Sequence, residues 1–198
     1  MTDTVAGADD WQTLVLGIGN LLWADEGFGV RCVEALHARF EFGEDVRVMD
    51  GGTQGIFLLP WVRQARRLLI FDAIDFALAP GSLRLIEGDD VPRYMGAKKV
   101  SMHQAGFQEV LSSAVLAGEF PDDIALVGVQ PELLDDYGGS LTPAVRTQVE
   151  PAVDLACRVL RGWGVRFVPR SEPLPDDRQT GPTALAIGDY ESGRPEIV

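Results

Sequence analysis

Long hydrophobic runs are missing from this chain of 198 residues. A helix that crosses a bilayer needs about 20 consecutive apolar residues, and no segment approaches that length. The first residues, MTDTVAGADDWQ, also lack the basic start and the apolar stretch of a secretory signal. We therefore expect a cytoplasmic protein that does not insert into a membrane.

Basic residues are scarce as well. The chain has 17 Lys and Arg against 30 Asp and Glu, which gives a formal net charge of −13. Proteins that bind nucleic acids attract the phosphate backbone with Lys and Arg, so this composition argues against a nucleic-acid partner. An acidic chain is better suited to a basic partner or to one that carries a metal ion.

Cysteine is equally rare, because the chain contains only Cys32 and Cys157, far apart in predicted helices. We interpret both as small apolar core residues rather than as a disulfide or a metal site. Hydrophobic residues make up 46% of the chain, which is enough for one compact domain with a buried core. The sequence has no internal repeat and no coiled-coil pattern, and it does not indicate an oligomeric state.

Short apolar runs alternate with helical patterns along the chain. Dense Val, Ile and Leu mark the predicted strands, which are residues 13–19, 46–50, 67–73, 81–87, 124–129 and 165–169. Apolar residues at helical spacing mark the predicted helices, which are residues 26–40, 54–66, 104–116 and 143–160. Pro60 is expected to kink or divide the second helix.

This alternation favours an α/β domain with a mainly parallel sheet and right-handed crossovers. We place a single α/β domain in residues 1–170. Residues 171–198 are rich in Pro, Gly and acids and show no sustained period, so we expect them to form a disordered tail.

The stretch GIGNLLWADEGFGV, residues 17–30, joins the first predicted strand to the first helix. Gly17 and Gly19 fit a dinucleotide-binding fingerprint, but its third glycine is missing. Asp25 and Glu26 place negative charge where a helix N-terminus would meet a phosphate, which argues against a nucleotide cofactor. Taken alone, Asp25 is expected to be the N-cap of the helix, and Glu26 is either a first-turn acid or part of a site.

Three acids lie at the carboxyl ends of successive predicted strands, where open parallel sheets bind ligands: Glu26, Asp50 and Asp72. Each alone could stabilise a turn, but an acid inside the apolar run LLIFDAI is costly to bury without a partner. His103 precedes a predicted helix and, with Glu26 and Asp72, forms a nitrogen and oxygen set that suits Ni, Zn, Mn or Fe. The other histidine, His37, is interpreted as an ordinary surface residue.

Several stretches resemble the [NiFe]-hydrogenase maturation endopeptidases and follow the order of that family: LGIGNLLWADEGFGVR (16–31), MDGGTQG (49–55), FDAID (71–75), HQAG (103–106), GEFP (118–121) and LVGVQPE (126–132). The resemblance covers residues 12–170. The sequence of the first motif is most similar to that of proteases that serve uptake hydrogenases. It implies a twisted, mainly parallel five-stranded sheet sandwiched between helices, of the phosphorylase/hydrolase type.

The resemblance also implies an activity, which is removal of the C-terminal extension of a hydrogenase large-subunit precursor after nickel insertion. The cut would follow a His or Arg just downstream of the last metal-binding Cys motif. Nickel carried by the precursor would be the recognition element, contacted by Glu26, Asp72 and His103. Asp50 or Glu26 would be the general base, and the sequence does not decide between carboxylate catalysis and a metal-bound hydroxide.

Two other functions use the same residues. A nickel-checking chaperone would bind the precursor without cutting it, whereas a free-standing metallohydrolase would hold its own metal and cleave short peptides. Other nucleophiles are not supported, because the chain has no Gly-x-Ser-x-Gly elbow and neither cysteine has a visible histidine partner.

Overall fold

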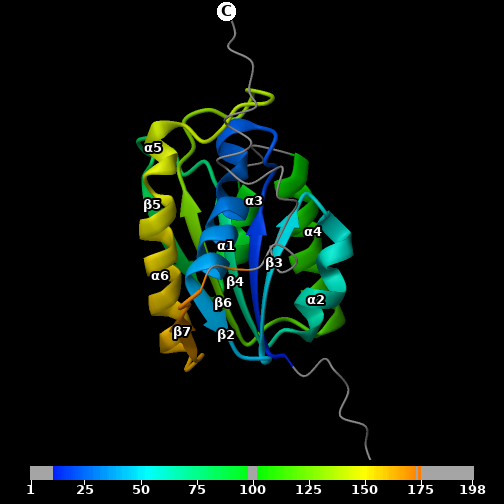
Figure 1. Ribbon diagram of the computed structural model, residues 1–198. Helices are drawn as coiled ribbons and strands as arrows, with labels where there is room; N and C mark the ends of the chain where they lie inside the picture. The colour runs from blue at the N-terminus through cyan, green and yellow to red at the C-terminus, as the bar shows by residue number, and fades with distance from the viewer. Residues whose placement is uncertain (1–10, 98–101, 173, 175–198) are drawn as a thin grey trace, which may run out of the picture.

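A computed structural model describes residues 11–97, 102–172 and 174 (Figure 1). Its centre is a five-stranded sheet with the strand order β3-β1-β4-β6-β5. In chain order these strands are β1 (Thr13–Ile18), β3 (Val46–Gly52), β4 (Arg67–Ala73), β5 (Leu83–Glu87) and β6 (Asp123–Val129). The strands β1, β3, β4 and β6 are parallel to one another. The strand β5 pairs antiparallel with β6 at one side of the sheet. The predicted α/β fold with a mainly parallel five-stranded sheet is confirmed.

The last predicted strand, residues 165–169, does not join this sheet. Only β7 (Phe167–Pro169) forms there, and it pairs antiparallel with β2 (Phe40–Phe42) in a separate two-stranded ribbon. The residues of β7 are half-buried or exposed, unlike those of β4 and β6, which lie between two layers of helices. The fifth strand of the sheet is therefore β5.

Helices cover both faces of the sheet (Figure 1). One face carries η1 (Ala24–Gly27), α1 (Phe28–Arg39), α5 (Pro143–Arg146) and α6 (Val149–Gly162). The other carries η2 (Gly55–Leu58), α2 (Leu59–Gln64), α3 (Asp90–Ala97) and α4 (Met102–Ala117). No helix in the described part of the chain is long and apolar enough to cross a bilayer.

The predicted helices differ from the observed ones in three places. The first begins with the 3-10 turn η1, and the second is divided into η2 and α2, with Pro60 in the first turn of α2. The fourth is divided into α5 and α6. The sequence did not predict α3, because Pro92 interrupts its short apolar pattern.

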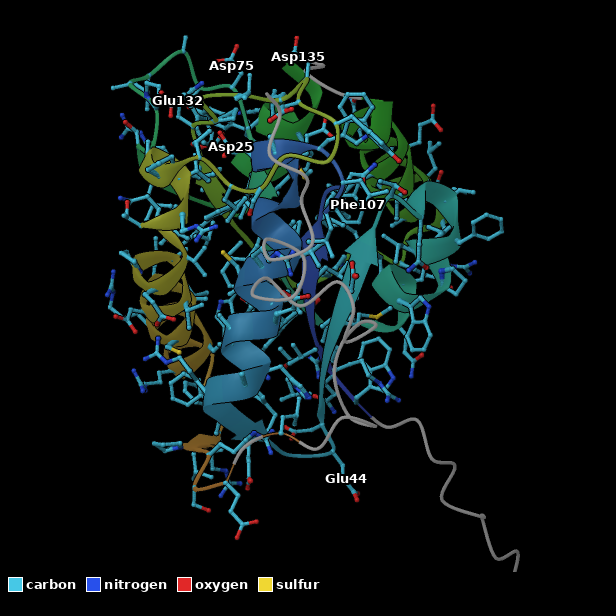
Figure 2. The ribbon with its side chains drawn as sticks, turned by 45° about the horizontal axis from the view of Figure 1, so that its top comes forward. Asp25, Glu44, Asp75, Phe107, Glu132 and Asp135 are labelled. Atoms are coloured by element: carbon cyan, nitrogen blue, oxygen red, sulfur yellow. The ribbon has the colours of Figure 1, made fainter. Side chains whose placement is uncertain are left out.

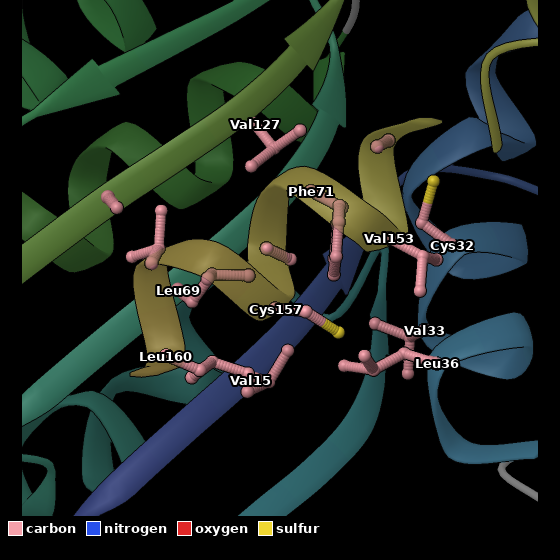
Figure 3. Close-up of a cluster of buried hydrophobic side chains, with 14 of the residues drawn as sticks. Val15, Cys32, Val33, Leu36, Leu69, Phe71, Val127, Val153, Cys157 and Leu160 are labelled. Carbon is pink, nitrogen blue, oxygen red and sulfur yellow. The ribbon is translucent and has the colours of Figure 1, made fainter. Parts of the chain in front are cut away.

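Alternate residues of β1 supply two apolar cores. Val15 packs with α1 and α6 in a cluster that also buries both cysteines, as Figure 3 shows. Leu14 and Leu16 pack on the opposite face with α2, α3 and α4. Burial of both faces explains the nearly continuous apolar runs of the parallel strands. Cys32 and Cys157 are buried free thiols, which confirms their interpretation as core residues.

The strand order places a topological switch point between β1 and β4. The chain leaves β1 through α1 on one face of the sheet, and it leaves β4 toward β5 and then α3 and α4 on the other face. Adjacent parallel strands whose connections depart to opposite faces form the usual ligand site of such sheets. Glu26 lies in the first of these connections, and Asp72 lies near the end of β4.

Candidate active site

The glycines of the first motif bring α1 unusually close to the sheet. A Cβ on Gly29 would lie 2.3 Å from the carbonyl oxygens of both Ile18 and Phe71, so only glycine permits this approach. A Cβ on Gly19, whose φ is +135°, would lie 1.8 Å from the carbonyl oxygen of Glu26. The Gly-rich turn is therefore a packing device that fixes Glu26 against the ends of β1 and β4, rather than a phosphate cradle.

Hydrogen bonds hold the backbone of Glu26 on both sides. Its N–H donates to the Trp23 carbonyl at 2.9 Å, and its carbonyl accepts from the Asn20 N–H at 3.2 Å. The half-buried side chain is partly removed from water, and this desolvation raises the pKa of the Glu26 carboxyl to about 7. Such a group is a poor permanent anion at neutral pH and would lose its proton when a cation approaches.

Asp72 is buried near the end of β4, as its apolar surroundings in the sequence predicted. One carboxylate oxygen, Oδ1, accepts a hydrogen bond from the N–H of Ala73 at 2.8 Å. Because η1 contacts β4, Asp72 and Glu26 lie together at the edge of the sheet formed by the carboxyl ends of the parallel strands. Asp72 comes from β4 and Glu26 from the connection that follows β1, so the two carboxylates flank the switch point.

Asp50 lies near the end of β3, opposite Gly17 of β1 in the parallel register. Its Oδ1 atom is buried and has no hydrogen-bond partner among the described residues. Desolvation raises the pKa of the Asp50 carboxyl to about 6, although a hydrogen bond from the Gly52 backbone acts in the opposite direction. The Glu34 carboxylate raises this pKa further, and the Arg31 guanidinium lowers it.

His103 belongs to the first turn of α4, but its side chain lies outside the described residues. The next turn of α4 is close to the start of η2, which follows β3, because a Cβ on Gly106 would lie only 3.4 Å from the Cα of Gly55. The fold thus brings the segments that carry all four predicted site residues to one edge of the sheet. The predicted three-ligand set stays a prediction, since among the described residues no three His, Cys, Asp or Glu form a metal-binding group.

Asp25 is not an N-cap, contrary to the prediction, because neither η1 nor α1 has a side-chain cap. It is completely buried, and its carboxylate accepts four hydrogen bonds from the segment after β6. The Thr142 N–H donates to Oδ1 at 2.7 Å, while the N–H groups of Glu132 and Leu133, both at 2.9 Å, and the Thr142 hydroxyl at 3.1 Å donate to Oδ2. Asp25 therefore fastens that segment to the turn that carries Glu26.

Gln130 holds a second connection at this edge. It is buried, and its side-chain oxygen accepts hydrogen bonds from the N–H groups of Phe76 at 2.7 Å and Leu78 at 3.1 Å. Its side-chain amide donates to the Asp75 carboxylate at 3.2 Å. The sequence alone did not identify Gln130 as a structural residue, because its partners lie more than 50 positions away.

The edge of the sheet is strongly acidic. The four connections that follow β1, β3, β4 and β6 contain no Lys or Arg in residues 19–27, 50–58, 72–82 and 129–142. Their acids are Asp25, Glu26, Asp50, Asp72, Asp75, Glu132, Asp135 and Asp136. Figure 2 shows labelled members of this group at one end of the molecule, with Glu44 at the other. This charge favours a cationic group approaching the edge.

A cavity of about 300 Å³ lies elsewhere, between β2, β3 and Arg170. None of the predicted site residues lines it. We place the site at the acidic edge because the switch point between β1 and β4 lies there, together with the two carboxyls whose pKa values are raised.

Comparison with known proteins identifies the family of this chain. The sequence model of the hydrogenase maturation protease family matches residues 30–159. The chain is 54% identical over 182 residues to the hydrogenase expression/formation protein HoxM of Azotobacter vinelandii, covering 92% of this chain and 86% of that protein. It is 43% identical over 160 residues to the hydrogenase 2 maturation protease of Escherichia coli K12, covering 80% of this chain and 96% of that protein.

A solved structure gives the same result. The hydrogenase maturating endopeptidase HybD from E. coli matches with a TM-score of 0.76 at 42% identity, covering 81% of this chain and 98% of that one. Fold and overall identity therefore agree. The chain belongs to the hydrogenase maturation protease family and is a peptide hydrolase.

Proposed function

We propose that this protein is the endopeptidase that removes the C-terminal extension of a [NiFe]-hydrogenase large-subunit precursor after nickel insertion. The observation that carries the proposal is the pair of carboxyls with raised pKa values, Glu26 and Asp50, at one acidic edge of the sheet. Family membership supplies the reaction class, peptide hydrolysis. The relatives' names refer to hydrogenase maturation, and we extend that substrate to this chain.

Asp50 is the general base in this proposal. With a pKa of about 6 its carboxylate is mostly ionised at neutral pH, yet it is basic enough to accept a proton from water. Its buried Oδ1 atom has no partner among the described residues, which leaves an acceptor for that water. The Gly52 N–H donates a hydrogen bond to the Asp50 carboxylate and so helps to hold the base in place. It is therefore not available to stabilise the oxyanion that develops on the scissile carbonyl.

Glu26 and Asp72, together with His103, are the residues that meet the nickel of the precursor. Two carboxylates and one imidazole suit Ni²⁺, and the acidic surroundings favour its approach. The Glu26 carboxyl would release its proton on contact, so recognition should strengthen as the pH rises through about 7. A precursor without nickel lacks this contact and leaves its extension unoriented.

Hydrolysis then follows in two steps. The oxygen of the attacking water forms a bond to the scissile carbonyl carbon while its proton passes to Asp50. When the C–N bond breaks, the same proton passes from Asp50 to the departing amine nitrogen, so the base is regenerated. We place the cut after a His or Arg just downstream of the last metal-binding Cys motif of the precursor.

The test is cleavage of a hydrogenase large-subunit precursor, nickel-loaded and nickel-free, followed by intact mass. We expect loss of one C-terminal peptide from the nickel-loaded form alone. Asp50→Asn should lower the cleavage rate at least about 100-fold, which is the usual contribution of a general base. Glu26→Gln should weaken nickel-dependent recognition, and the exposed Glu44→Gln at the opposite end is the matched control.

Other outcomes decide between the alternatives. Normal cleavage by Asp50→Asn would assign water activation to the metal instead. Equal cleavage of both precursor forms would exclude nickel as the recognition element. Binding without any mass change, with a precursor that its known protease cuts, would indicate a chaperone. Turnover of short peptides by protein that retains its own metal would indicate a free-standing metallohydrolase.

A further inference from the structure

The segment of residues 132–142, here called the rim loop, exposes apolar side chains beside the site. Tyr137 is 68% exposed and Leu133 is 38% exposed. Leu22, from the connection after β1, is also exposed and belongs to the segment that the rim loop contacts. Apolar groups gathered on one loop beside an active site are typical of a contact surface for another protein.

The rim loop is firmly held despite this exposure. Its backbone bonds to the connection after β1 at three points: Ala24 N–H to Gly139, Asp25 N–H to Leu133, and Gly138 N–H to Leu22. The four hydrogen bonds to the Asp25 carboxylate fix it from inside. The Tyr137 ring also packs edge-on against Trp23, with centroids 5.3 Å apart. A partner that binds here does not have to order a loose loop, which lowers the entropic cost of association.

The charged residues of the rim loop itself are all acidic, while the exposed Arg146 of α5 donates a hydrogen bond to the Ser140 hydroxyl of the loop at 3.2 Å. The rim loop contains Glu132, Asp135 and Asp136 and no Lys or Arg. Glu132 and Asp135 are exposed and labelled at the acidic end of the molecule in Figure 2. The two lysines of the chain, Lys98 and Lys99, fall outside the described residues. A surface that combines exposed acids with a central aromatic ring is complementary to a basic patch around an apolar pocket.

From these observations we infer that the rim loop is the docking surface for the body of the large-subunit precursor, and that it binds a basic patch with an apolar centre. This inference rests on the proposed function. Asp25 links the docking surface to the site, because it binds the rim loop and is followed directly by Glu26. A precursor held on the rim loop would present its extension beside Glu26 and would be recognised separately from its nickel.

The test compares charge reversals at the two ends of the molecule. Glu132→Lys/Asp135→Lys changes the rim loop, and the matched control Glu44→Lys/Asp45→Lys makes the same change in net charge at the opposite end. All four side chains are exposed, so both proteins should fold. We expect the rim variant to raise KM for nickel-loaded precursor about tenfold, to keep kcat within about twofold and to reduce the salt dependence of binding. The control should match wild type.

A second pair isolates the apolar contact. Tyr137→Ser should raise KM about fivefold or more, whereas Leu116→Ser, at the exposed far end of α4, should have no effect. KM values within twofold of wild type for both rim variants would overturn the inference while leaving the proposed function intact. If wild type binds the precursor without cutting it, the same variants are compared by Kd. Neither binding nor cleavage by wild type would overturn both proposals.

Discussion

Asp25→Asn should be one of the most damaging single-atom changes in this protein. The Asp25 carboxylate is fully buried and offers only acceptors to four donors, three of them backbone N–H groups. In asparagine one oxygen becomes an NH₂ group. Whichever way the amide lies, its hydrogens face at least one backbone N–H of Glu132, Leu133 or Thr142.

The size of the effect follows from this geometry. If the amide oxygen replaces Oδ2, the bonds from Glu132 and Leu133 lose their charge assistance, which contributes about 1 kcal/mol each. The Thr142 N–H then has no acceptor, and a buried unsatisfied donor costs about 1–3 kcal/mol. We expect the free energy of unfolding to fall by about 3–5 kcal/mol, a large part of the ~5–15 kcal/mol typical of natural domains.

Urea denaturation at pH 7.5, followed by circular dichroism, measures this loss as a shift of the midpoint at constant m. Thr142→Val removes only the hydroxyl donor and should cost about 1 kcal/mol. Glu44→Gln, on the opposite end, should change stability by less than about 0.5 kcal/mol. An Asp25→Asn protein within 1 kcal/mol of wild type would refute the assignment of Asp25 as the fastening point of the rim loop.

Three further predictions follow from burial and close packing. Gly29→Ala should cost at least about 3 kcal/mol of stability, because its Cβ would meet two backbone oxygens. Gly162→Ala should be neutral or stabilising, because a Cβ there has nothing within 4 Å. Thermal melts compare the two variants. The stability of Glu26→Gln relative to wild type should be about 1 kcal/mol greater at pH 8 than at pH 5, after allowance for solvent screening. The reason is that burial raises the pKa of Glu26 in the folded state to about 7, so the stability of wild type falls as the pH rises from the unfolded value of 4.5 through 7. Urea midpoints at pH 5 and pH 8 measure this difference. An equal gain for Glu26→Gln at both pH values would contradict it. Cys32 and Cys157 should react with a thiol reagent at least about 100-fold more slowly in the native protein than in urea, because both are buried and desolvation raises their pKa values; fast native labelling would contradict the core assignment.

The parallel strands could be predicted because burial on both faces leaves a strong signal in the sequence. The dense apolar runs of β1, β4 and β6 require two covering layers, and helices between them supply those layers. The β2 and β7 ribbon could not be predicted in this way. Each of its strands has three residues, and its pairing joins positions more than 120 residues apart.

The site shows the same division between local and long-range information. The common location of Glu26, Asp50 and Asp72 could be predicted because acids at the strand ends of a parallel sheet share one edge. The role of Asp25 was missed because its partners are backbone N–H groups 107 to 117 residues later, and a backbone group carries no sequence signal. The raised pKa values also depend on burial that only the folded chain creates.

The ribbon has a practical consequence for studying this enzyme. Beyond β7, Arg170 donates hydrogen bonds to the carbonyls of His37, Arg39 and Phe40, so it is secured to the last turn of α1 and the start of β2. Figure 1 places β2 and β7 at the end of the sheet opposite α5 and the η1 turn. A surface anchor or fluorescent label attached at Arg170 would therefore start from the end of the sheet opposite the proposed site. This position is therefore our choice of attachment point for single-molecule assays of the proposed cleavage.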